Sequence, residues 1–408
     1  MSNFSSVTGP SDSDVIDQLL GFSQDDPMHV VRYQRDKVVA ATQGSYDGLF
    51  DPALPGLGLA ERLLVALLIA RLSGSGRLEA HYLARLNALH ATSPLSAAEQ
   101  RALDANAVST APQDDAFTGA EDARLRAILT FAHTLALRPV EGDRDALLRL
   151  PEAGLTTPEV VVLAQLIAFV AYQVRVVAGL QALGQLSHVS ESATASSVAG
   201  DTSPFVHPAH LPKPGEPVRV NGFTSETLGW KAWLPVVALD QATPEQIAVL
   251  EASHPAAKTS DYYRVLVHQP RILQERSIAF NAIMYAPGGL SRAERELASA
   301  VVSRVNRCVY CASVHAQRFE QLAKRNDVIY QVFADPQGAG TNAREKAIVQ
   351  ASIDLTSAPG QFGPDQLRPV KAAGLSTLEI IDLIHAIAIF AWANRLMLNL
   401  GEAVIPSP

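Results

Sequence analysis

Cysteine is nearly absent from this chain, which contains only two in 408 residues. Two cysteines cannot form the disulfide framework typical of small secreted domains, so a reducing, intracellular setting is the default expectation. The first 18 residues, MSNFSSVTGPSDSDVIDQ, contain neither a basic nor an apolar segment and therefore predict no secretory signal peptide. Together these features predict a cytoplasmic protein.

An excess of positive charge is also missing. Lys and Arg number 33 against 41 Asp and Glu, and the formal net charge of -8 argues against the basic surface of a nucleic-acid-binding protein. Hydrophobic residues make up 48% of the chain and charged residues 18%, which is enough apolar material for sizeable cores. The length suggests two domains.

A clean membrane-spanning run of about 20 apolar residues is missing as well. The most apolar stretch, VVVLAQLIAFVAYQVRVV, is interrupted by Gln165, Gln173 and Arg175. We therefore expect this stretch to be a buried helix and the protein to have no membrane partner.

The chain divides into two apolar halves that resemble each other. Ser, Pro and Gly are concentrated in residues 187–217, which we interpret as a linker between residues 12–186 and residues 218–405. EAGLTTPEVVVLAQLIAFVAYQVRVV, which begins at Glu152, matches AAGLSTLEIIDLIHAIAIFAWANRLM, which begins at Ala372, at an offset of 220 residues. AERLLVALLIARL and AERELASAVVSRV match at an offset of 233. We interpret the pattern as a tandem duplication.

Both halves are predicted to be helical. Apolar residues recur at spacings of three and four, and no run alternates as a β-strand would. Ser291 and Glu294 form a capping box. Glu159 and Glu379 follow Ser or Thr in the same way, which repeats the helix-start signal. The expected fold is all-α, with two tandem helical bundles related by the duplication.

Both cysteines lie in the stretch RCVYCASVHAQRF, as Cys308 and Cys311, with His315 four residues further on. On a helix over 307–322 these three residues share one face, because steps of three and four residues stack. A break near Asn306 would place both cysteines in the first turn of that helix. There, free backbone N–H groups and the positive end of the helix dipole favour a thiolate.

Comparison of the halves indicates where the chemistry resides. Glu296 aligns with Leu63, so the second half is predicted to hold a carboxylate near an apolar interior, where it needs a partner or a raised pKa. The positions of the two cysteines and the histidine align with Ser75, Leu78 and Tyr82. Any thiol chemistry is therefore expected in the second half alone.

These residue types suit thiol catalysis. His315 lies one turn below Cys311 and can accept the thiol proton directly or through water, while Glu296 orients the imidazole. A thiolate attacks the O–O bond of a peroxide and becomes a sulfenic acid. The second cysteine condenses with it to a disulfide, which an external dithiol resets.

Two other interpretations of the pair remain open. The cysteines could be an inert part of a helical core. Cys308, Cys311 and His315 could instead be three ligands of an open zinc site, although no further cysteine exists for a closed one. A thioredoxin fold is disfavoured, because no βαβ pattern surrounds the motif.

The spacing of these residues resembles a known family. Glu296, eleven residues, Cys308, two residues, Cys311, three residues and His315 reproduce the signature of the AhpD-like alkylhydroperoxidases in the carboxymuconolactone decarboxylase superfamily. The second half looks like such a peroxidase-related protein throughout, and the first half looks like a catalytically silent member.

The resemblance implies roles and partners. Cys311 would attack the peroxide, Cys308 would resolve, and His315 would act as base through water with Glu296 behind it. Tyr310 stands where the best-known members have a histidine, and it can still donate a hydrogen bond. A lipoyl or thioredoxin-like protein would supply electrons, with no metal or other cofactor. A trimer of the fused pseudo-dimers is the implied assembly.

The leading functional hypothesis is thus a thiol-dependent hydroperoxide reductase. One alternative is a decarboxylase or lactone-cleaving lyase, like the branch that gave the superfamily its name, which does not depend on the cysteine pair. The other is a redox-sensing or assembly protein, in which the cysteines switch an oligomer interface without turnover.

Overall fold

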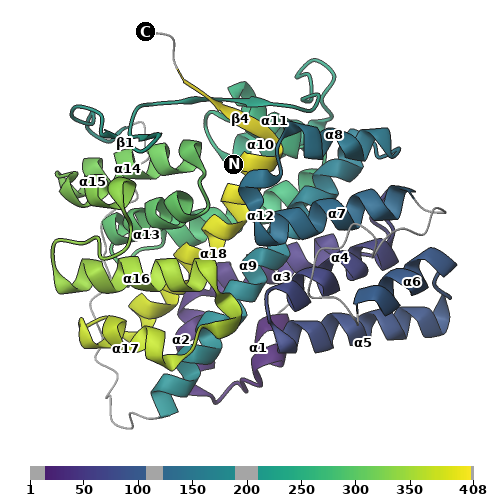
Figure 1. Cartoon of the computed structure of the whole chain (residues 1–408), viewed down its shortest axis with the longest axis horizontal. Helices are drawn as coiled ribbons and strands as arrows, with labels where there is room; N and C mark the ends of the chain where they lie inside the picture. Colours follow the sequence, from purple (N-terminus) through teal and green to yellow (C-terminus); the bar gives the residue numbers. More distant parts are fainter. Residues whose placement is uncertain (1–13, 107–122, 189–209, 406–408) are drawn as a thin grey trace.

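The computed structural model describes residues 14–106, 123–188 and 210–405, and Figure 1 shows that helices dominate them. The all-α prediction is confirmed. The helices of the first half are α1 (Val15–Leu20), α2 (Pro27–Arg32), α3 (Asp36–Leu49), α4 (Leu59–Leu72), α5 (Gly76–Thr92), α6 (Ala97–Asn106), α7 (Ala123–Leu137), α8 (Arg144–Glu152) and α9 (Thr157–His188).

The second half repeats much of this order and adds short strands. Its elements are β1 (Arg219–Val220), β2 (Phe223–Thr224), β3 (Gly229–Ala232), α10 (Pro244–Ser253), α11 (Asp261–Leu266), α12 (Pro270–Tyr285), α13 (Arg292–Val305), α14 (Val309–Ala323), α15 (Asp327–Ala334), α16 (Ala343–Ser357), α17 (Pro364–Ala372), α18 (Thr377–Asn399) and β4 (Gly401–Val404). β1 pairs antiparallel with β2, and β3 with β4. These strands are two to four residues long, which is too short for the sequence to show alternation.

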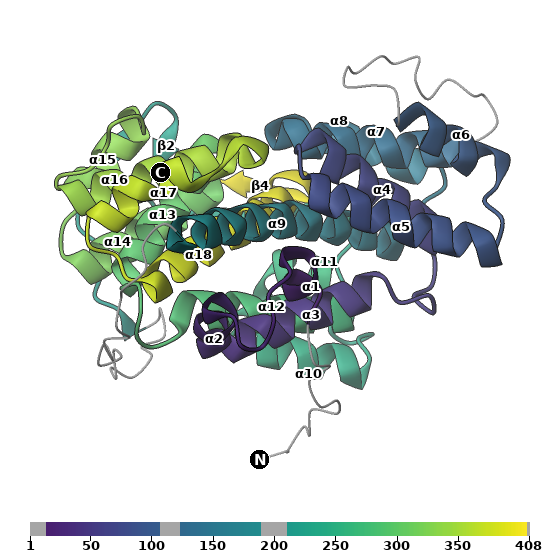
Figure 2. The ribbon, with the colours of Figure 1, turned by 90° about the horizontal axis from the view of Figure 1, so that it is seen from below.

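The two halves pack through matching helices. α9 and α18 run side by side through the centre, with α4–α8 at one end and α13–α17 at the other (Figure 2). α3 of the first half likewise packs against α12 of the second. Trp392 in α18 donates a hydrogen bond to Gln165 in α9 at 2.8 Å. One hydrophobic core consequently extends through both halves.

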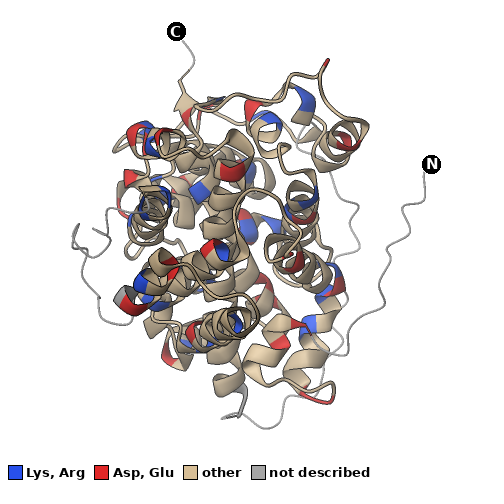
Figure 3. Ribbon diagram, turned by 90° about the vertical axis from the view of Figure 1, so that its right-hand side faces the viewer, with Lys and Arg blue, Asp and Glu red and all other residues tan. Residues whose placement is uncertain are grey.

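The long apolar stretch of the first half is a buried helix, as predicted. α9 and α18 each have the length and hydropathy of a membrane span, but the windows concerned are 100% and 94% buried inside the fold. Such burial is typical of core helices of soluble proteins. Figure 3 shows acidic and basic residues interspersed along the helices on one side of the molecule.

The predicted capping boxes at Ser291 and Ser376 are both present. A feature that the sequence did not predict accompanies the capping glutamates: in each half, one arginine bridges two of them. Arg124 joins Glu61 to Glu159, and Arg344 joins Glu294 to Glu379. These equivalent contacts support the tandem duplication, which stays a prediction, as do the proposed domain boundaries. Most of the proposed linker lies outside the described residues.

A buried charge cluster joins the halves. Asp382 in α18, 3% exposed, accepts hydrogen bonds from Arg35 of the first half at 2.7 Å and from Arg295 in α13 at 2.8 Å. Arg35 and Arg295 also donate to the Gly288 carbonyl. Because both guanidinium groups are buried, the single carboxylate is essential to their charge balance.

Replacement of Asp382 should therefore destabilise the whole chain. Asp382→Ala leaves two buried cations without a carboxylate and should lower the free energy of unfolding by about 3–5 kcal/mol. Asp365→Ala is the control, because Asp365 is 73% exposed in its pair with Arg368 and should lose less than about 1 kcal/mol. Urea denaturation measures both, and equal losses would contradict the assignment.

Candidate active site

The turn between α13 and α14 presents the cysteines. α13 ends at Val305 with Asn306 as its C-cap, which confirms the helix break predicted near Asn306. Arg307 follows with φ +61°, in the left-handed region that side chains other than glycine rarely adopt. Gly74, with φ +66°, occupies the equivalent position in the first half. Cys308 is the N-cap of α14, and Cys311 lies in its first turn.

A polar chain behind the turn holds it in place. Asn306 donates its side-chain amide to Asn394 Oδ1 at 3.0 Å, and Asn394 donates to Ser303 Oγ at 3.0 Å. Ser303 Oγ donates in turn to the Ser299 carbonyl at 2.7 Å. Asn394 was not predicted as a site residue, but it aligns with Val174 in the first half, and that contrast could have revealed it. Hydrogen bonds of this kind, which lie behind the reactive residues, fix the geometry of a reactive group.

The predicted carboxylate and imidazole meet. Glu296 in α13, 1% exposed, lies with Oε2 2.5 Å from Nδ1 of His315 in α14. Arg292, one turn earlier on α13, places Nε 3.7 Å from Glu296 Oε1 and balances its charge. An ionised carboxylate can only accept, so Nδ1 carries the proton and Nε2 is left as the basic nitrogen. His315 also packs edge-on against Phe390, with ring centroids 4.3 Å apart.

The two sulfurs are reduced and buried. Cys308 is 1% exposed and Cys311 is 4% exposed, and both are free thiols. Burial raises the pKa of Cys308 well above its ordinary value, and a hydrogen bond to Cys311 and the charge there raise it further. Cys308 is therefore held as a protonated thiol beside Cys311.

Tyr310 lies between the cysteines in sequence and is partly buried. Burial, and then the charge of Cys311, raise its pKa to about 12, so its hydroxyl is neutral at physiological pH. Among the described residues its hydroxyl makes no hydrogen bond to either sulfur. The structure thus brings Cys308, Cys311, His315 and Glu296 together around the start of α14, with Tyr310 at the edge.

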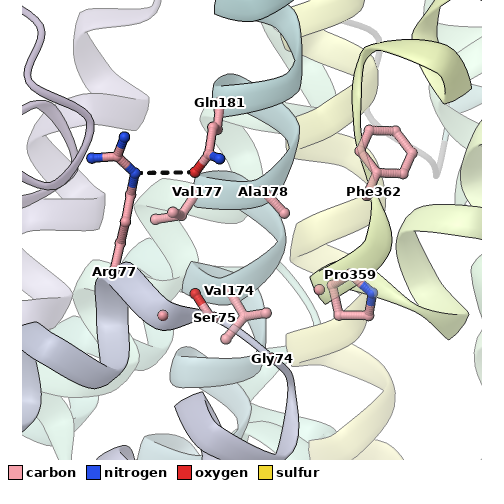
Figure 4. Close-up of a pocket in the computed structure, with 11 residues that line it drawn as sticks. Gly74, Ser75, Arg77, Val174, Val177, Ala178, Gln181, Pro359 and Phe362 are labelled. Carbon is pink, nitrogen blue, oxygen red and sulfur yellow. Dashed lines mark hydrogen bonds between the residues drawn. The ribbon is translucent and has the colours of Figure 1, made fainter.

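A cavity lies beside the first-half position that is equivalent to Cys308, between the start of α5, α9 and residues 359–362 of the second half. Its volume is about 360 Å³, and it opens at the start of α5, where Ser75 replaces the first cysteine (Figure 4). Arg77 donates to Gln181 of α9 at 3.1 Å across it. No thiol, imidazole or carboxylate lines this cavity. Leu63 and Tyr82, which align with the acid and the base, are fully buried.

The zinc interpretation receives no support from the geometry. In the part of the chain that the structure describes, no group of three or more His, Cys, Asp or Glu side chains is arranged to hold a metal ion. His315 Nδ1 is already bound to Glu296.

Comparison with known proteins finds similarity in this region. Residues 272–353, from α12 into α16, match the model of the carboxymuconolactone decarboxylase family. The uncharacterized protein YdfG of Bacillus subtilis (strain 168) is 26% identical over 114 residues, which cover 28% of this chain and 77% of that protein. The segment that carries the cysteine pair is therefore similar to the carboxymuconolactone decarboxylase family.

One solved structure is also similar. It is described as the alkylhydroperoxidase AhpD core of an uncharacterized peroxidase-related protein from Ralstonia eutropha JMP134. The identity is 22% and the TM-score 0.35, over 40% of this chain and 86% of that one.

The asymmetry of the two thiols should be measurable. In Cys311→Ser, alkylation of Cys308 by iodoacetamide should become fast only at alkaline pH, because burial, the largest cause of its raised pKa, remains and only the thiolate reacts. In the matched variant Cys308→Ser, the remaining Cys311 should react at least roughly tenfold faster at pH 8. Equal rates in the two variants at that pH would show that the thiols are equivalent.

Proposed function

We propose that this protein is a thiol-dependent hydroperoxide reductase. The observation that carries the proposal is the buried hydrogen bond between Glu296 and His315, which lies on the same helix as two free thiols, one turn after Cys311. A nucleophile, a base and a group that orients the base are the three parts that thiol catalysis requires.

In the first step, Cys311 acts as the nucleophile. Its thiolate forms a bond to the terminal oxygen of ROOH, the O–O bond breaks, and RO leaves, so sulfur is oxidised to sulfenic acid and the peroxide is reduced by two electrons. The thiol proton passes to Nε2 of His315 and finally to RO, which leaves as ROH. No hydrogen bond joins His315 to either sulfur among the described residues, so this transfer uses a bridging water. Tyr310 is a neutral donor at the edge of the site.

In the second step, Cys308 resolves the intermediate. Its sulfur displaces water from the sulfenic acid of Cys311 and forms a disulfide. An external dithiol then reduces this disulfide by two successive exchange reactions and becomes oxidised itself. A lipoyl group or a thioredoxin-like protein supplies that dithiol by analogy, and no metal or organic cofactor takes part.

The first half serves as a structural partner in this proposal. It supplies α9 against α18 and α3 against α12, which are the contacts of a fused pseudo-dimer. Three such chains would form the assembly that the family resemblance implies.

The match to the carboxymuconolactone decarboxylase family favours one other candidate, a decarboxylase or lactone-cleaving lyase. That reaction does not need the thiols. Release of carbon dioxide from a lactone acid, unaffected by alkylation of both cysteines, would establish it and exclude the reductase.

The reductase is tested by turnover of cumene hydroperoxide with dihydrolipoamide as electron donor. Cys311→Ser and Cys308→Ser should both lose turnover, because one removes the nucleophile and the other the resolving thiol. Glu296→Gln should lower kcat/KM by about 10²–10⁴-fold, because the imidazole loses the charge that orients it. Glu251→Gln, an exposed pair with Lys258, is the control and should retain wild-type turnover. Full activity in both cysteine variants would eliminate the mechanism.

A further inference from the structure

A buried hydroxyl beside the thiols has no hydrogen-bond partner. Tyr262 in α11 is 3% exposed, and its Oη makes no hydrogen bond among the described residues. Buried polar groups are almost always paired in folded proteins, so an unpaired one needs an explanation. A group that forms its hydrogen bond only with a bound molecule is one such explanation.

Ring contacts place Tyr262 on the same wall as the catalytic base. The Arg276 guanidinium lies 5.4 Å from the Tyr262 ring centroid and 5.1 Å from that of Phe280. The Phe280 ring is 6.0 Å from Phe390, which packs on His315 at 4.3 Å. A chain of contacts through Arg276, Phe280 and Phe390 thus connects the ring of Tyr262 to His315.

The electrostatic surroundings make Tyr262 a neutral donor. Burial, and the charges of Cys311 and Cys308, raise its pKa, while Arg276 lowers it. Arg276 is itself 3% exposed, and within the described ranges it makes no ion pair and its Nε no hydrogen bond. A cation over the ring makes the phenol a stronger hydrogen-bond donor, and the sulfurs close by define where an oxygen acceptor would arrive.

The reductase mechanism needs such a donor. When the O–O bond breaks, negative charge develops on the departing oxygen, and a second donor would stabilise it while His315 holds the thiol proton. Donors that point at developing charge in a dry site are among the strongest contributors to catalysis.

We propose that Tyr262 donates a hydrogen bond to the departing oxygen of the hydroperoxide, with Arg276 positioned behind its ring. The inference rests on the proposed function. In balanced form, the Cys311 thiol and ROOH give the sulfenic acid and ROH. Tyr262 stabilises RO⁻ until the proton released by the thiol reaches it. Tyr262 is unchanged at the end.

The test compares leaving groups in the full-length chain. The second-order rate of thiol oxidation is measured for wild type and Tyr262→Phe with tert-butyl hydroperoxide, whose departing alkoxide needs a proton, and with peracetic acid, whose departing acetate does not. Loss of the hydroxyl should lower the rate with tert-butyl hydroperoxide by about 100-fold and the rate with peracetic acid far less. Tyr330→Phe, which removes an exposed hydroxyl on α15, is the control and should show no such selectivity.

Two further measurements separate a catalytic from a structural hydroxyl. Iodoacetamide alkylation has no departing oxygen, so a structural disturbance would slow it together with both peroxides, and that result would overturn the proposal. Removing an unpaired hydroxyl should leave the melting temperature of Tyr262→Phe equal to wild type or higher, whereas a fall would indicate a structural hydrogen bond and also overturn it.

The outcomes also separate this inference from the reductase itself. Wild-type protein that reduces both peroxides, with Tyr262→Phe equally active on both, overturns the role of Tyr262 and leaves the reductase intact. Wild-type protein whose thiols react with neither peroxide overturns both.

Discussion

The hydrogen bond between Glu296 and His315 is the constraint on which the site depends. It is buried, it sets the tautomer of the imidazole, and it ties α13 to α14 across the turn that carries the cysteines. Because Glu296 would be costly in this apolar interior without a partner, its presence requires both the imidazole and Arg292 nearby. The left-handed turn at Arg307 and the aromatic ring of Phe390, which packs on His315, belong to the same region as the two thiols and this pair.

Much of this arrangement follows from sequence patterns. The helical period, the capping boxes and the break before Cys308 are local signals, and local signals predict local structure well. The contrast between Glu296 and Leu63 also indicated a buried carboxylate, because the duplicated half acts as an internal reference. The roles of the individual cysteines depend on electrostatics around them, which the spacing alone does not determine.

Other features could not be predicted, because they depend on contacts between distant segments. Arg35 and Asp382 meet only after the halves have packed, and nothing in their neighbouring residues marks them. Tyr262 acquires meaning only from the folded state, where its buried hydroxyl has no hydrogen-bond partner among the described residues. The pairing of β3 with β4 is a further example, because it joins residues 229–232 to residues 401–404 across most of the second half.

The shared core has a consequence for how such chains can vary. α18 buries an apolar surface against α9, and α12 packs against α3. The region that resembles a known family therefore packs against helices of the other half. The unit that sequence comparison recognises is therefore smaller than the unit that folds. Changes in the cysteine-free half must therefore keep its fit to the other half and also the charge of Arg35, which pairs with Asp382 there.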